Sequence, residues 1–489
     1  MSGFLGRRGA LGVIAGSALI PAAARAAAPG GRIGWLETTK NAPGRSRTAP
    51  ALGARPGSAF GSDATVAIDR PGRSVAGFGG AFSEKGWQAL SALPEKARWA
   101  ALDALFGNGG CGFTLCRTPI GANDIARGWY SYDETPGDFA LDRFSTANDR
   151  ETLIPFIKAA QQVQPGLKLW ASPWSPPTWM KRNGHYAMAP VWSGQPTNGI
   201  RPDQLGREGE DWFIQEDRYF DAYARYFRRY VEDYAQAGIP IGTVMPQNEF
   251  NSAQPFPSCC WTPEGLARFL PWLGREMDKV GVAVFLGTLE RGNAGLFNRV
   301  MDHPEAAKVV KGVGVQWAGK GALTTLRAQH PGLEIWGSEQ ECGVGNNDWH
   351  YARYGWGLVR RYFEAGATAW DYWNLVMPTG GMSGWGWPQN SLVVVDTARG
   401  TFRLTHDYWL MRHIGGAVKP GARLVPVDSF LGFDDQLAFR NPDGSLVLVA
   451  SNMVSAAQTV RYTIGTKMLE LRLAPDSLNT ITVPASALA

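Results

Sequence analysis

The sequence predicts an α/β fold, a (β/α)8 TIM barrel with an attached all-β sandwich. From Val75 onward, short β-branched or aromatic runs alternate with helical stretches, which is typical of parallel βα units. After Lys419-Pro420 the pattern changes to short strands separated by turn clusters, and no long helix is expected there. The 489 residues are enough for one large domain and one smaller domain.

Residues 1–28 have the form of an export signal. Arg7-Arg8 precede an apolar stretch rich in Gly and Ala, and small residues follow at a candidate cleavage site. Adjacent arginines favour the twin-arginine route, although an ordinary secretory signal leads to the same destination. The apolar stretch is short for a membrane span. We therefore expect a periplasmic or extracellular protein without stable membrane insertion.

Residues 29–74 are expected to form an N-terminal arm, because their first part is rich in Gly, Pro, Ala and Arg. Strands from this arm are expected to help complete the sandwich. Residues 75–415 are expected to form the catalytic barrel. Its eight predicted strands span residues 75–82, 112–118, 167–172, 241–246, 282–287, 313–317, 334–338 and 368–373.

An amphipathic helix is expected over residues 216–236, where five aromatic side chains share one face. Residues 416–489 are expected to form the C-terminal sandwich, which has no helix of comparable length. Its predicted strands span residues 424–427, 437–440, 446–450, 459–462, 469–473 and 479–483.

Charge and reactive residues argue against several classes of site. Loss of residues 1–28 would lower the formal net charge from +5 to about +2. No basic run alternates with aromatics, so no nucleic-acid partner is expected. The six histidines form no HxH or HExxH pattern, and neither a metal nor another cofactor is expected. The five cysteines leave at least one thiol free in a monomer, and the oligomeric state stays open.

Two predicted strands each end on a glutamate. The run 242–245 leads to Asn248-Glu249, and the run 333–337 leads to Ser338-Glu339. Barrel chemistry takes place at the carboxyl ends of the strands, so both acids would lie at one mouth. A glycosidase needs such a pair, with one carboxyl neutral to protonate the leaving oxygen and the other ionised. Glu341 would point the same way as Glu339, so strand periodicity does not separate these two.

These glutamates belong to a longer series of motifs, on which the chain resembles glycoside hydrolase family 30, the glucosylceramidase-like retaining β-glycosidases. The resemblance implies that Glu249 is the general acid/base and Glu339 the nucleophile of a double displacement. It also implies that Asn248 binds the sugar 2-hydroxyl and that Arg117 keeps the nucleophile ionised. The motifs are residues 77–82, 117–121, 130–133, 171–181, 247–249, 338–339 and 371–374.

Tryptophans near strand ends are expected to stack on sugar rings, and Trp174, Trp317 and Trp373 are the substrate-binding candidates among them. Two departures from the family pattern put glucosyl specificity in doubt. Glu84 stands where relatives have Asp and is expected to hold an outer sugar hydroxyl. Gln316-Trp317-Ala318 replaces His-Trp-Tyr and lacks a phenol that can touch the nucleophile.

The resemblance thus implies a retaining β-glycosidase of β-linked glucosides or related β-glycans, either glucosylceramidase-like or endo-β-1,6-glucanase-like. The substrate would be a β-linked carbohydrate or a glycolipid. The alternative is a non-catalytic glycan-binding protein that kept the barrel. The presence of both acids, Asn248 and Arg117 argues against that alternative.

Overall fold

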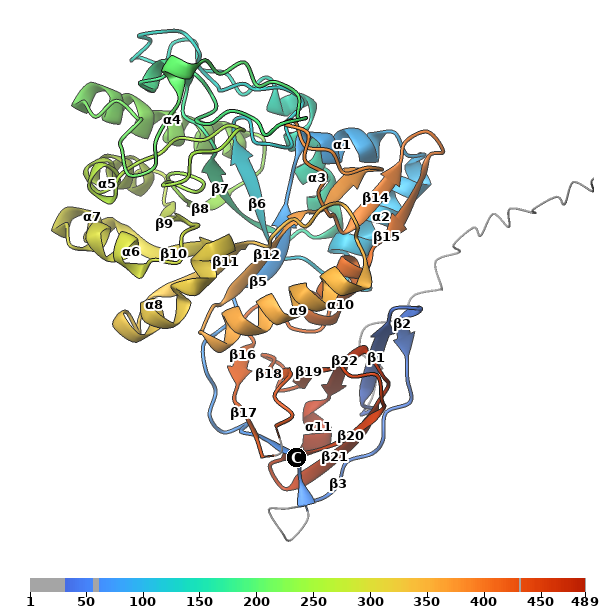
Figure 1. Cartoon of the computed structure of the whole chain (residues 1–489). Coiled ribbons are helices and arrows are strands. Elements are labelled where there is room, and N and C mark those ends of the chain that lie inside the picture. The colour runs from blue at the N-terminus through green and yellow to red at the C-terminus, as the bar shows by residue number, and fades with distance from the viewer. Residues whose placement is uncertain (1–30, 56–60, 431, 489) are drawn as a thin grey trace, which may run out of the picture.

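The computed structural model describes residues 31–55, 61–430 and 432–488, so the export-signal segment 1–28 lies outside the described residues. Eight parallel strands close into a barrel surrounded by helices, and a separate β-sandwich lies beside it (Figure 1). The predicted fold class is confirmed. The barrel strands are β5 (Gly77–Ala81), β6 (Leu115–Ile120), β7 (Lys168–Pro173), β8 (Ile241–Val244), β9 (Ala283–Leu289), β10 (Val310–Gln316), β11 (Glu334–Glu339) and β12 (Ala369–Asn374).

Helices cover the barrel because each presents an apolar face to the strands. In α4 (Asp217–Gln236) four tyrosines and two phenylalanines are buried on one face, as expected from the aromatic spacing. The other helices are α1 (Glu84–Ser91), α2 (Glu95–Phe106), α3 (Leu153–Val163), α5 (Pro263–Asp278), α6 (Ala294–Met301), α7 (Pro304–Val309), α8 (Leu323–Gln329), α9 (Trp349–Glu364) and α10 (His406–Gly415).

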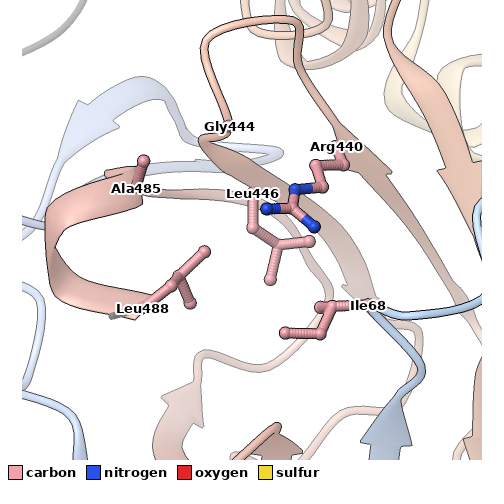
Figure 2. A pocket seen from close by; sticks show the side chains of 6 residues that line it. All are labelled: Ile68, Arg440, Gly444, Leu446, Ala485 and Leu488. Atoms are coloured by element: carbon pink, nitrogen blue, oxygen red, sulfur yellow. The ribbon is translucent and has the colours of Figure 1, made fainter.

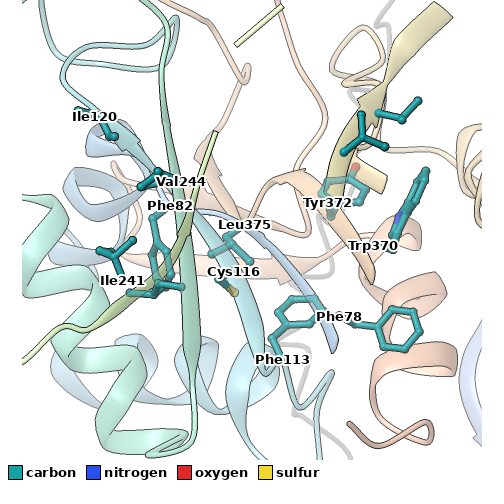
Figure 3. Packing of buried hydrophobic residues seen from close by; sticks show 14 of the residues in the cluster. Phe78, Phe82, Phe113, Cys116, Ile120, Ile241, Val244, Trp370, Tyr372 and Leu375 are labelled. Atoms are coloured by element: carbon teal, nitrogen blue, oxygen red, sulfur yellow. The ribbon is translucent and has the colours of Figure 1, made fainter. Parts of the chain in front are cut away.

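Large apolar side chains fill the space between the strands and these helices. Figure 3 shows Phe78, Phe82 and Phe113 packed close to Cys116 and Leu375 in this core. Strands β5 and β6 approach closely at Gly79, where a Cβ would stand 1.6 Å from the backbone oxygen of Leu115. Only glycine fits at this position. All five cysteines are buried and unpaired.

The sandwich joins strands from both ends of the described chain. One sheet has the order β16-β18-β19-β22-β1-β2 and the other the order β17-β4-β20-β21-β3. The N-terminal strand β1 pairs antiparallel with β22 along its whole length. The strands are β1 (Gly34–Thr39), β2 (Ala42–Ser46), β3 (Gly53–Ala54), β4 (Ala64–Val66), β16 (Arg423–Val425), β17 (Val427–Ser429), β18 (Gln436–Arg440), β19 (Leu446–Asn452), β20 (Gln458–Ile464), β21 (Lys467–Leu473) and β22 (Ser477–Val483).

The strand β19, in the middle of the first sheet, is buried on both faces. In β19, Leu446 and Leu448 belong to the core between the two sheets, whereas Val447 and Val449 belong to the core shared with the barrel. Helices α9 and α10 lie between barrel and sandwich (Figure 1). His413 of α10 bridges the neighbouring strands β1 and β22, because its ring nitrogens lie 2.8 Å from Thr38 Oγ1 and from Thr480 Oγ1.

A cavity of about 220 Å³ lies within the sandwich, beside the short C-terminal helix α11 (Ala485–Leu488). Ile68, Leu446 and Leu488 line it together with Arg440 (Figure 2). It is remote from the carboxyl ends of the barrel strands, so it is no candidate for the active site.

The connections at the carboxyl end of the barrel are long. Residues 174–216 join β7 to α4, and residues 379–392 join β13 (Val376–Pro378) to β14 (Val393–Asp396), which pairs with β15 (Thr401–Leu404). Among the described residues, no helix combines the length and the apolar character that a bilayer crossing demands.

Candidate active site

Glu339 is the last residue of β11 and is 6% exposed at the mouth of the barrel. Its Oε2 accepts a hydrogen bond from Arg117 Nη1 at 2.5 Å, and its Oε1 accepts one from Trp317 Nε1 at 2.8 Å. Burial raises the pKa of Glu339 above its ordinary value, and Arg117 and Trp317 oppose that rise. The ionised form is thus the one that these two donors stabilise.

Arg117 is held rigidly in β6. Its side chain is fully buried, and Nη2 donates to Ser172 Oγ at 2.8 Å and to Asn248 Oδ1 at 2.7 Å. The guanidinium lies over the Trp174 ring at 4.1 Å from the ring centroid and over Trp170 at 4.7 Å. These contacts fix a positive charge against one oxygen of Glu339.

Glu249 follows β8 in a tight turn and has a left-handed backbone, with φ at +47°. Its backbone N–H donates to Thr288 Oγ1 at 2.8 Å. The carboxyl accepts from two amides, Gln316 Nε2 at 3.2 Å and Gln254 Nε2 at 2.9 Å. A non-glycine residue keeps such a conformation only where its surroundings enforce it, as at many functional sites.

The environment of Glu249 differs from that of Glu339. Burial raises the pKa of Glu249 well above its usual range, and the nearby carboxylates Glu290 and Glu339 raise it further. Among the described residues, only the two neutral amides of Gln316 and Gln254 donate to its oxygens, and they oppose the rise. Glu249 is therefore suited to hold a proton at neutral pH, whereas Glu339 has a cationic partner.

Asn248 and Gln316 connect the two acids. Asn248 Oδ1 accepts from Arg117, from Thr288 Oγ1 at 3.1 Å and from Gln316 Nε2 at 3.2 Å. The Asn248 oxygen thus accepts three hydrogen bonds. Its amide nitrogen, in contrast, donates to no group in the described part of the chain. Ser338 Oγ in turn donates to Gln316 Oε1 at 3.0 Å and fixes that amide.

Glu341, the other acid beyond β11, is engaged elsewhere. Lys320 Nζ lies 2.6 Å from its Oε1, and the Tyr354 hydroxyl donates to its Oε2 at 2.8 Å. It shares none of the partners of Glu339. This geometry favours Glu339 over Glu341 as the nucleophile, a choice that strand periodicity leaves open.

The expectation for Glu84 is wrong. Its carboxylate accepts from Arg127 through both the backbone N–H and Nε, each at 3.0 Å, from Asn148 at 2.8 Å and from Thr152 at 3.0 Å. None of these partners is bonded to Glu249 or Glu339. Ser83 caps helix α1, so Glu84 enters the first helical turn, and its side chain ties the helix to the neighbouring loop.

Asp124 is a site residue that the sequence reasoning missed. Its Oδ2 accepts from Gln389 Nε2 at 2.9 Å, while its buried Oδ1 has no partner among the described residues. Burial raises the pKa of Asp124 to about 7. Gln389, which bonds Asp124, also accepts from Trp373 Nε1 at 2.8 Å, and this links the carboxyl to the aromatic cluster at the mouth. The sequence does contain a signal for this residue, because Asp124 is an acid that lies only four residues beyond the end of a barrel strand.

The predicted tryptophans divide into two groups. Trp174 and Trp373 stack on each other at 5.3 Å between ring centroids and form one apolar cluster with Trp317. Trp317 also has a left-handed backbone, with φ at +48°, and its indole N–H donates to Glu339. Trp170, Trp179, Trp336 and Trp370 instead pack within the protein core.

Metal ligands do not gather at this mouth. Across the described ranges, no group of three or more His, Cys, Asp or Glu side chains could hold a metal ion. The arrangement is therefore a pair of buried carboxyls with different hydrogen-bond partners, a fixed arginine, free polar atoms on Asn248 and Asp124, and aromatic walls.

Comparison with known proteins matches both domains. Residues 75–415 match the glycosyl hydrolase family 30 TIM-barrel domain, and residues 435–487 match the glycosyl hydrolase family 30 beta sandwich domain. A putative glucosylceramidase 1 of Caenorhabditis elegans is 27% identical over 81% of this chain and 77% of its own length. An endo-1,6-beta-D-glucanase of Neurospora crassa is 26% identical over 78% and 79%. The solved structure of SrfJ from Salmonella typhimurium shares the fold, with a TM-score of 0.80 at 22% identity over 92% of this chain and 99% of that one.

Proposed function

Because the chain belongs to glycosyl hydrolase family 30, we propose that it cleaves β-linked glucosides or related β-glycans with retention of configuration. The observation that carries this proposal is the unequal environment of the two carboxyls. Glu339 accepts from a buried arginine and an indole N–H, whereas Glu249 lies among carboxylates and neutral amides. A glycosidase of this kind needs one ionised and one protonated carboxyl.

In the first step, an oxygen of Glu339 attacks the anomeric carbon while the proton of Glu249 passes to the glycosidic oxygen, so the bond to the leaving group breaks. In the second step, Glu249, now ionised, takes a proton from water. The resulting nucleophile displaces Glu339 from the sugar and regenerates the starting state. Arg117 stabilises the carboxylate at the start and at the end of this cycle.

Three groups are placed to bind the sugar. The Asn248 amide nitrogen is free to donate to the 2-hydroxyl, a bond that strengthens as positive charge develops on the ring. The unpaired Oδ1 of Asp124 is free to accept from a hydroxyl farther around the ring. Trp174 and Trp373 supply an apolar wall for the face of the sugar.

A panel of chromogenic β-glycosides tests the proposal, with nuclear magnetic resonance used to identify the first-formed anomer. We expect turnover of at least one β-glycoside and a β-product. Glu339→Gln should abolish turnover, and Glu341→Gln should retain most of it. Initial formation of the α-product would contradict retention, and binding without any turnover would favour a non-catalytic glycan-binding protein instead.

Relatives with glucosylceramidase and endo-1,6-beta-D-glucanase names leave two substrate classes, glycolipid and β-glucan. Parallel assays with glucosylceramide in micelles and with β-1,6-linked oligosaccharides separate them. We also propose that the protein acts outside the cytoplasm, on the strength of Arg7-Arg8 and the apolar stretch that follows. Cell fractionation tests this location.

A further inference from the structure

A cluster of three tryptophans, in which Trp192 is exposed, Trp387 half-buried and Trp385 buried, lies at the mouth of the barrel, outside the residues assigned so far. Trp192, in the connection from β7 to α4, leaves 55% of its surface exposed. Its ring packs against Trp385 at 5.0 Å and Trp387 at 5.6 Å between centroids, and those two rings are stacked at 5.7 Å. Phe256 supports Trp385 from a third loop at 5.6 Å. We call Trp192, Trp385 and Trp387 the outer platform.

The loops that carry the outer platform also hold the catalytic site. Trp387 packs on the apolar cluster that contains Trp373, and two residues later Gln389 bonds both Trp373 and Asp124. The loop that carries Phe256 also carries Gln254, which donates to Glu249. The platform is therefore continuous with the site on the side of both Asp124 and the proposed acid/base.

The chemistry of the platform suits a sugar ring. Indole faces stack on the C–H face of a pyranose. Within the described chain, the Trp385 Nε1 and Gln195 Oε1 atoms are buried at this cluster and have no hydrogen-bond partner. Gln195 lies against the same loop, since a Cβ on Gly386 would stand 2.1 Å from its Oε1. Polar groups thus lie within this aromatic cluster, which favours a sugar, with its hydroxyls, over an alkyl chain as the ligand.

The exposure of the Trp192 ring is energetically unfavourable in the free protein. A large aromatic ring left in water loses the free energy that its burial would provide. The exposed Trp192 ring packs on the buried Trp385 and the half-buried Trp387, so this surface is held in place before any ligand arrives.

We propose that the outer platform is a second sugar-binding subsite, which takes a neighbouring pyranose ring of the β-linked glycan whose scissile bond lies at Glu249 and Glu339. This inference rests on the proposed function and selects a glycan chain over a glycolipid as the substrate class. Trp192 binds the ring and takes no part in the chemistry.

The experiment compares Trp192→Ala with Phe430→Ala, a matched loss of an aromatic side chain that is 60% exposed on the sandwich. The probes are an aryl β-glucoside, β-1,6-linked glucose oligomers of two to five units, and glucosylceramide in micelles. We expect Trp192→Ala to lower kcat/KM on the longer oligomers by about tenfold, mainly through KM, and to leave the aryl glucoside unchanged. Trp192→Phe should recover part of the loss, and Phe430→Ala should behave like the unmodified protein.

Binding of the same oligomers to Glu339→Gln by calorimetry separates this inference from the proposed function. Tighter binding of longer oligomers that is lost in Glu339→Gln/Trp192→Ala supports the subsite even if no substrate of the panel is turned over. Equal loss on the aryl glucoside and the oligomers would overturn the inference. Affinity independent of chain length, or an effect confined to glucosylceramide, would do the same.

Discussion

The hydrogen bond from Trp317 to the nucleophile can be removed without deleting the aromatic ring. Trp317→Phe takes away the indole N–H that lies 2.8 Å from Glu339 Oε1 and leaves Arg117 bonded to the other oxygen. A hydrogen bond to a charged group contributes about 1.5–3 kcal/mol. At about 1.36 kcal/mol per factor of ten, the balance between ionised and protonated Glu339 should shift toward the protonated form by about ten- to a hundredfold.

The sign of the effect follows from the pKa of Glu339. Burial already raises that pKa, and Trp317 is one of the groups that lower it, so its loss raises the pKa further. Turnover requires ionised Glu339. The acid limb of the pH profile of kcat/KM should therefore move to higher pH in Trp317→Phe. On that limb, kcat/KM should fall by about ten- to a hundredfold.

The plateau of the profile should change less than the limb. As Glu339 attacks, its charge diminishes, so the lost bond stabilised the ground state at least as much as the transition state. Trp373→Phe is the matched control, because that indole donates to the neutral Gln389 at 2.8 Å rather than to Glu339. A Trp317→Phe profile whose acid limb coincides with that of the unmodified protein would refute the reasoning.

The remaining predictions concern three other carboxyls. Glu290→Gln removes a carboxylate that raises the pKa of Glu249, so the alkaline limb of kcat/KM should move to lower pH; a limb that stays in place would show that Glu290 does not act on the acid/base. Glu84→Gln should cost about 1–3 kcal/mol in the free energy of unfolding, measured with urea, because it weakens the buried bonds to Arg127, and kcat/KM should stay within a few-fold. Asp124→Asn should lower kcat/KM on β-glucosides by about ten- to a hundredfold, and a deoxy-glucoside that lacks the partner hydroxyl should show no further loss in that variant.

Strand positions could be predicted from the sequence because parallel barrel strands are buried on both faces. All six residues of β6 are buried, as are all six of β12, and both strands are rich in apolar residues, although each also carries a charged residue, Arg117 or Asp371. The two glutamates could be located from the same signal, since Glu339 is the last residue of β11 and Glu249 lies five residues beyond the end of β8. The helix at 216–236 could also be predicted from the sequence, because its buried aromatic residues repeat with helical spacing.

Side-chain direction beyond a strand end could not be predicted in the same way. Glu84 and Asp124 both follow barrel strands. Glu84 lies in the first turn of helix α1, which Ser83 caps, whereas Asp124 faces the site. Trp317 reaches the nucleophile from a turn with positive φ. No periodicity governs such turns, and their geometry depends on the tertiary contacts of the loops.

The pairing of β1 with β22 has a consequence for the order in which the protein folds during synthesis. Residues 34–39 leave the ribosome early, but their partners, residues 477–483, are made only after the whole barrel sequence has been translated. Until then, the edge of β1 that pairs with β22 stays unpaired. Thr480 of β22, which His413 links to Thr38 of β1, is also still missing. The barrel can begin to form while the chain grows, whereas the sandwich must wait for its last strand. A stop codon just before residue 477 would therefore leave β1 without its β22 partner, and a separately expressed segment 477–488 should restore the pairing.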